Sequence, residues 1–63
     1  MITERYIFAG NIQRLSLVRP PSVRQAKRVS DVLIDGQRVQ VLYEDGTRAR
    51  FTRTDKLILV VER

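Results

Sequence analysis

A run of basic side chains without an acidic neighbour is the part of this sequence most suited to a chemical task. Five basic residues fall within fifteen positions: Arg14, Arg19, Arg24, Lys27 and Arg28. Guanidinium groups bind phosphate oxygens in bidentate geometry, whereas a lysine ammonium acts as a point charge. Neutralising phosphates releases counterions, so such binding weakens as salt rises. We expect this basic segment to contact phosphates, and the alternative is a solvated face that keeps the chain soluble.

The net charge of the chain shows the same bias. The formal charge is +5, and residues 1–30 carry six basic groups against Glu4 alone, whereas residues 31–63 carry six groups of each sign. Net charge governs association and solubility and does not set the fold. The imbalance therefore points to a polyanionic partner.

Catalytic chemistry has little support in the sequence. The chain contains no histidine and no cysteine, so the commonest general base, a reactive thiol and the usual zinc ligands are missing. The carboxylates of the second half fall in or beside turns, where turn formation already explains them, and the glycines match no phosphate-binding loop. We expect a protein that is not an enzyme, with no catalytic residue, no metal and no cofactor.

The length and the apolar pattern limit the architecture. Sixty-three residues make one domain at most, and the chain lacks both a bilayer-spanning apolar stretch and a secretory signal, so we expect a cytoplasmic protein with no membrane contact. One apolar run does not alternate with polar residues and predicts a strand buried on both faces. This strand would close a barrel or form a homo-oligomer through Leu57, Ile58, Leu59, Val60 and Val61.

Two Asp-Gly pairs, ten residues apart, predict hairpins around a run rich in β-branched residues. At the second pair a two-residue loop would place arginines among the apolar residues. A three-residue loop over residues 44–46, with Gly46 in a bulge, instead pairs Val41 with Ala49 and keeps the apolar residues on one face. At the first pair a two-residue loop over 35–36 pairs Ile34 with Gln37. The predicted core face is Val32, Ile34, Val39, Val41, Tyr43, Ala49 and Phe51.

The opposite face of these strands follows by alternation and gathers a second basic group. It carries Asp31, Leu33, Arg38, Gln40, Leu42, Arg48, Arg50 and Thr52. The basic and amide side chains of this face could lie against a nucleic-acid backbone, and the alternative is an exposed sheet with cross-strand pairs such as Asp31 with Gln40. Leu33 and Leu42 would either contact bases or pack under an N-terminal hairpin.

The first half of the chain gives weaker signals. Gly10 and Asn11 suit a hairpin turn between strands over residues 6–9 and 12–18, while the spacing of Phe8, Ile12 and Leu15 also suits a helix. After two prolines, residues 22–30 form either a short helix or an irregular, arginine-rich loop.

The stretch from Val29 to Asp55, which includes VLIDGQRVQVLYEDGTRARFTRTD, resembles the strand-turn-strand core of small chromo, Tudor and KOW-type barrels. It is most similar to the seven-kilodalton chromatin proteins of crenarchaea, in which a three-stranded sheet lies across the DNA minor groove. The resemblance implies DNA contacts on the sheet face, from Leu33, Arg38, Gln40, Leu42, Arg48 and Arg50. This chain differs from that family in its arginine-rich composition, its two prolines and its apolar last strand.

The sequence as a whole predicts a mainly β, small five- or six-stranded antiparallel barrel with at most one short helix or helical turn. The predicted function is non-enzymatic nucleic-acid binding through phosphate contacts, with weak sequence preference and DNA favoured over RNA. The protein would then lie in the nucleoid or another cytoplasmic nucleoprotein. The alternatives are an assembly module that uses the apolar C-terminal strand and an acidic partner, or a subunit of a larger nucleoprotein such as a ribosome.

Overall fold

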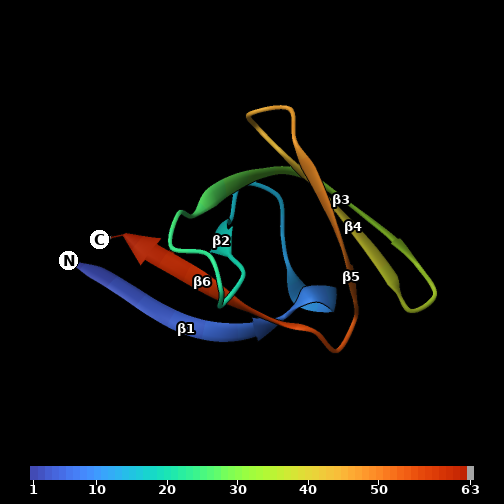
Figure 1. Cartoon of the computed structure of the whole chain (residues 1–63), viewed down its shortest axis with the longest axis horizontal. Helices are drawn as coiled ribbons and strands as arrows, with labels where there is room; N and C mark the ends of the chain where they lie inside the picture. The colour runs from blue at the N-terminus through green and yellow to red at the C-terminus, as the bar shows by residue number, and fades with distance from the viewer. Residues whose placement is uncertain (63) are drawn as a thin grey trace.

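The structure, a computed structural model, describes residues 1–62. Six strands and one 3-10 turn account for most of the chain (Figure 1). In order, they are β1 (Ile2–Phe8), η1 (Ala9–Asn11), β2 (Leu17–Arg19), β3 (Lys27–Asp35), β4 (Arg38–Tyr43), β5 (Arg48–Thr52) and β6 (Lys56–Glu62). The strands form one antiparallel sheet in the order β1-β6-β2-β3-β4-β5. The predicted mainly β fold with six antiparallel strands is confirmed.

The sheet curls around a single apolar core without closing, so β1 and β5 remain its two edges. Its centre holds fully buried valines of three strands, Val18, Val29 and Val41, together with Leu57 of β6. The curl depends on β3, which pairs with β2 at its start and with β4 along the rest of its length (Figure 1). A bulge between Val29 and Asp31 interrupts that pairing. The extra residue bends the strand and keeps apolar residues on the inner face on both sides of the bulge.

The hairpin between β4 and β5 has the predicted three-residue loop. Tyr43 donates its backbone N–H to Thr47 O at 2.9 Å and accepts the N–H of Gly46 at 3.1 Å. Gly46 has φ +89, a left-handed conformation that glycine adopts without steric cost. Val41 lies opposite Ala49, as the burial argument requires. The register of this hairpin is therefore confirmed.

The predicted register of the first hairpin is wrong by two residues. Ile34 lies opposite Val39 and not Gln37, because the loop consists of Gly36 and Gln37. Gly36 has φ +60 at the first central position, as in a type II′ turn. Moving a pairing by two residues leaves every side chain on its own face, so the inner and outer faces stay as predicted. Ile34 nevertheless lies beyond the core near the loop and is 43% exposed.

The predicted N-terminal hairpin does not form, because β1 pairs with β6 and not with β2. Gly10 lies instead in the 3-10 turn. The turn is held by hydrogen bonds from Ala9 N–H to Asp55 O at 2.8 Å and from Gly10 N–H to Arg53 O at 3.2 Å. A Cβ atom on Gly10 would lie 3.3 Å from Cβ of Arg53, so this approach favours glycine. Residues 20–26 form the irregular loop and no helix.

The apolar strand β6 lies inside the sheet, between β1 and β2. Leu57 and Ile58 are buried on opposite faces, and residues 59–61 are half-buried. The prediction that this strand is covered on both faces therefore holds for its first half. Within residues 1–62 no helix has the length and apolar character to cross a membrane.

Candidate functional site

The outer face of β3, β4 and β5 arranges its side chains in rows across the three strands. Leu33 lies opposite Gln40, and Gln40 lies opposite Arg50. The neighbouring rows place Asp35 beside Arg38 and Thr52, and Asp31 beside Leu42 and Arg48. Asp31 therefore does not face Gln40 as predicted, since the first hairpin has a different register. All the residues predicted for this face do lie on it.

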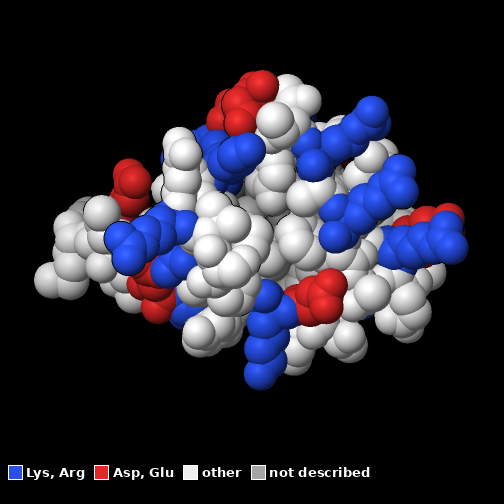
Figure 2. All heavy atoms as spheres, in the orientation of Figure 1, with Lys and Arg blue, Asp and Glu red and all other residues white. Residues whose placement is uncertain are grey.

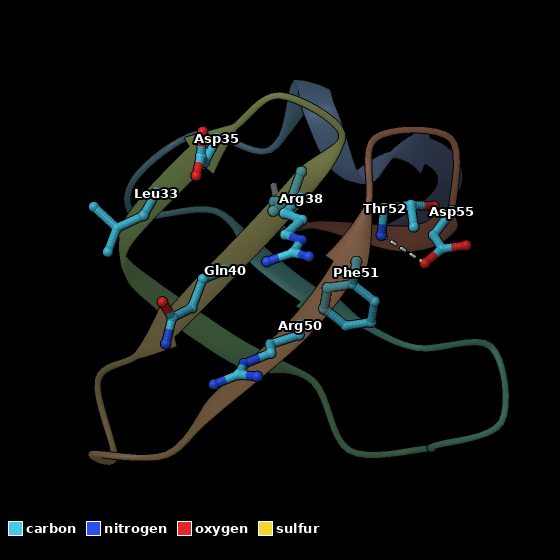
Figure 3. Close-up of a pocket in the computed structure, with 9 residues that line it drawn as sticks. Leu33, Asp35, Arg38, Gln40, Arg50, Phe51, Thr52 and Asp55 are labelled. Atoms are coloured by element: carbon cyan, nitrogen blue, oxygen red, sulfur yellow. Dashed lines mark hydrogen bonds between the residues drawn. The ribbon is translucent and has the colours of Figure 1, made fainter.

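A shallow hollow forms around the middle of this face (Figure 3). Arg38, Gln40 and Arg50 project from β4 and β5 toward it. The hollow is lined by Leu33, Asp35, Arg38, Val39, Gln40, Arg50, Phe51, Thr52 and Asp55. The hollow is open, and its lining carries the carboxylates of Asp35 and Asp55 as well as two arginines. It therefore suits an extended polar ligand better than an enclosed small molecule.

Three arginines of this face form what we call the basic stripe: Arg38, Arg48 and Arg50. None of the three side chains has an ion-pair or hydrogen-bond partner among residues 1–62. The acids of the face, Asp31 and Asp35, both stand on β3, so the outer face of β4 and β5 carries only positive charge. Arg48 and Arg50 lie two residues apart on one strand, which separates their Cα atoms by about 7 Å.

The free edge of β5 adds backbone donors to the basic stripe. Tyr43 and Thr47 form a hydrogen-bonded pair, and such pairs alternate along an antiparallel ladder. The backbone N–H groups of Arg48 and Arg50 therefore point away from β4, toward solvent. The next such group, that of Thr52, is capped by Asp55 Oδ2 at 2.9 Å (Figure 3). The edge thus combines two guanidinium groups with two open amides, which are donors that proteins use to bind phosphate.

The N-terminal basic segment, by contrast, is largely engaged with its own chain. Arg19 forms an ion pair with Glu4 at 2.6 Å, and its side chain is only 18% exposed. Arg28 lies 3.7 Å from Glu44 and donates to Leu15 O at 2.7 Å. Arg14 donates to Ser30 O at 3.3 Å. A phosphate approaching these side chains would compete with existing partners.

Lys27 is the most highly connected basic residue of this segment. Its ammonium lies 3.2 Å from Asp45, donates to Thr47 Oγ1 at 3.0 Å and lies 5.3 Å from the centre of the Tyr43 ring. The pKa of Asp45 is lowered to about 2, mainly by hydrogen bonds from Thr47 and to a smaller extent by Lys27. Burial, followed by the charge of Asp45, raises the pKa of Tyr43. The cluster fastens the β4–β5 hairpin to the start of β3.

The two predicted basic surfaces therefore differ in availability. Among the five basic residues from Arg14 to Arg28, only Arg24 lacks a side-chain partner in the described part of the chain. Figure 2 shows several basic side chains projecting on the right, over β3–β5, with some acidic atoms beside them. Acidic and basic groups also lie together at the top, over the β4–β5 turn. The fold brings the acids of that turn onto the N-terminal segment and leaves the basic stripe open.

The two leucines of the outer face have no N-terminal hairpin above them, since that hairpin does not form. Leu33 is 52% exposed and Leu42 is half-buried. Leu33 is therefore accessible to a partner, whereas Leu42 is only partly accessible. The apolar segment predicted for an oligomer is hydrogen-bonded along both sides of β6, so a second copy could meet it only through side chains.

Sequence reasoning missed Arg53 and Asp55, which shape one end of the hollow. Arg53 donates from Nε to Gly36 O and from its backbone N–H to Gln37 O at 3.0 Å, and so ties the β3–β4 loop to the end of β5. Asp55 caps Thr52. Thr52 and Asp55 are three residues apart, a spacing that could have predicted this cap, whereas the Arg53 contacts join distant loops and have no local signal.

Comparison with models of protein families, with curated proteins and with solved structures finds no match to this chain. The resemblance to small chromatin barrels therefore stays a prediction.

Proposed function

We propose that this protein binds nucleic acid through the basic stripe and the adjoining edge of β5, without catalysing a reaction. The observation that carries the proposal is the set of three arginines that no acid of the described chain neutralises, on two adjacent strands beside a hollow. Their guanidinium groups and the open amides of Arg48 and Arg50 would contact phosphates. Phosphate contacts position a protein without reading sequence, so sequence preference is weak.

A duplex backbone suits this surface better than stacked single-stranded bases. The outer face of β3–β5 carries no aromatic residue, and Phe51 only borders the hollow, so the face lacks the stacking platform that single-strand binders use. DNA is favoured over RNA because the sequence resembles DNA-binding barrels. Leu33, exposed between Asp31 and Asp35 on β3, would meet the groove wall or a sugar.

The test is titration with a mixed-sequence DNA duplex, and separately with RNA, at two salt concentrations. We expect binding at low salt that weakens as salt rises. Arg50→Gln removes one phosphate contact, which lowers the slope of log affinity against log salt by about one unit. Arg24→Gln removes the same charge from the loop and is the matched control, which should bind like the unaltered chain.

Absence of binding at low salt rejects the proposal. Loss of affinity in Arg24→Gln together with unchanged binding in Arg50→Gln would move the contact from the sheet to the N-terminal segment.

A further inference from the structure

The two edge strands of the sheet, β1 and β5, differ in the type of side chain that they expose. The β5 edge is five residues long and carries arginines, a usual way to prevent pairing with another strand. The β1 edge is seven residues long and has exposed apolar side chains on its outer face, namely Ile2 at 66%, Tyr6 at 66% and Phe8 at 45%. The β1 edge is therefore the one suited to another strand.

The backbone of β1 is oriented for such pairing. Ala9 N–H donates to Asp55 O, and the register places Ile7 opposite Leu57. Because hydrogen-bonded pairs alternate, the odd-numbered residues of β1 bond to β6. The N–H and C=O groups of Glu4, Tyr6 and Phe8 then point to the free edge, where no group of residues 1–62 meets them. A new strand would satisfy these groups and place its own side chains beside the exposed apolar ones.

We propose that the strand that covers this edge is β1 of a second copy of the chain, paired antiparallel about a twofold axis at Tyr6. The charges and the length of β1 together select this register, since an axis at Thr3 or at Ile7 would pair fewer residues of β1 than an axis at Tyr6. An axis at Glu4 or at Arg5 would set like charges directly opposite each other, which is destabilising. The axis at Tyr6 sets the two tyrosines opposite each other, Glu4 opposite Phe8 and Arg5 opposite Ile7.

The carboxylate of Glu4 is not left unpaired in this arrangement. Arg19 already holds it at 2.6 Å, on the outer face that Ile58 shares. The dimer would join two six-stranded sheets into one. It would also add buried apolar surface to a chain of 63 residues that has no cysteine for a disulfide, and small domains without such staples often rely on oligomers. The proposal does not depend on nucleic-acid binding.

The first experiment measures mass by sedimentation equilibrium over a range of protein concentrations, without nucleic acid. We expect a dimer in the full chain and a monomer in Phe8→Pro. Proline removes an edge N–H there at no cost to the β1–β6 ladder, and Phe8 has φ −77, within the range of proline. Leu33→Ser removes a similarly exposed apolar side chain from β3, away from the β1 edge, and should remain dimeric. A monomeric full chain at every concentration overturns the proposal, as does a dimer that persists in a folded Phe8→Pro.

A second experiment tests the register independently of variant stability. Because the chain has no cysteine, one introduced thiol can crosslink only to the same position of a second copy. Residues on the axis form a hydrogen-bonded pair with Cα atoms about 5.5 Å apart, within the range of a disulfide. Tyr6→Cys should form a disulfide-linked dimer under mild oxidation. Thr3→Cys, at an exposed position, leaves the charges of β1 unchanged and should not form one. Crosslinking of Thr3→Cys in place of Tyr6→Cys contradicts the register.

Discussion

The basic residues of this chain differ in whether they already form an ion pair with an acidic residue. Exposed ion pairs such as Lys27 with Asp45 contribute only about 0–1 kcal/mol to stability, so they do not determine the fold. They do decide which charges face a ligand unopposed. Arg50 has no partner among the described residues, and a phosphate can reach it without displacing one.

Acid titration tests the contacts of Asp45. Its pKa is lowered from 3.8 to about 2, first by Thr47 hydrogen bonds, so the ionised form stabilises the folded state. This contribution is complete above about pH 4 and is lost as pH falls toward about 2. We expect Asp45→Asn to be less stable than the unaltered chain at pH 6, with a difference that narrows between pH 4 and pH 2 in urea unfolding.

Asp35→Asn is the control for the change in net charge, because the carboxylate of Asp35 accepts no hydrogen bond from residues 1–62. A difference between Asp45→Asn and the unaltered chain that stayed constant down to pH 2 would show that the Thr47 contacts do not favour the ionised carboxylate.

The register of a hairpin can be predicted from the sequence only where the alternative registers bury different side chains. At the β4–β5 turn the competing register places arginines in the core, so sequence alone selects the right one. At the β3–β4 turn, registers two residues apart bury the same side chains, and the choice depends on the loop conformation of Gly36. The sequence therefore predicts both faces of the sheet and only one of the two registers.

The strand pairing of the N-terminal half could not be predicted from neighbouring residues, because the strands that it pairs with lie far along the chain. β1 pairs with β6 across more than fifty residues, as Ile2 opposite Glu62 shows. A turn signal at Gly10 predicts only neighbours in sequence. The conformation of Gly10 is instead set by hydrogen bonds to the β5–β6 connection, which the pattern of the sequence does not contain.

The interior position of β6 can be tested by truncating its buried leucine. Leu57 is 1% exposed, and Leu57→Ala should cost about 2–5 kcal/mol of unfolding free energy. Leu33→Ala, at a 52% exposed site, should change stability by no more than about 0.5 kcal/mol. Urea unfolding measures both. Equal effects of the two substitutions would contradict the assignment of Leu57 to the core.

At the scale of the molecule, the excess of positive charge in the first thirty residues is largely offset in the fold by acidic residues that pair with it. The N-terminal basic segment has no acidic residue within it, which is why the sequence predicts a binding surface there, yet Glu4, Glu44 and Asp45 all fold against it. The face of β3–β5 was predicted by alternation alone and keeps its arginines unpaired. Alternation could identify the face, but only the tertiary fold shows which basic groups are neutralised.

The two proposed surfaces lie on opposite edges of the sheet, β1 for the second copy and β5 for nucleic acid. Pairing through β1 therefore leaves each basic stripe open. A dimer would carry two stripes, and linked binding sites raise the overall affinity for a ligand long enough to reach both.

The most direct test of the nucleic-acid interface follows the backbone amide signals of the chain by NMR during titration with a mixed-sequence DNA duplex at low salt. The largest shifts should fall on Arg48 and Arg50, whose amides face the open edge, and on Arg38 and Gln40 across the hollow. Shifts confined to residues 20–26, or no shifts at all, would contradict the assignment of this face as the nucleic-acid contact.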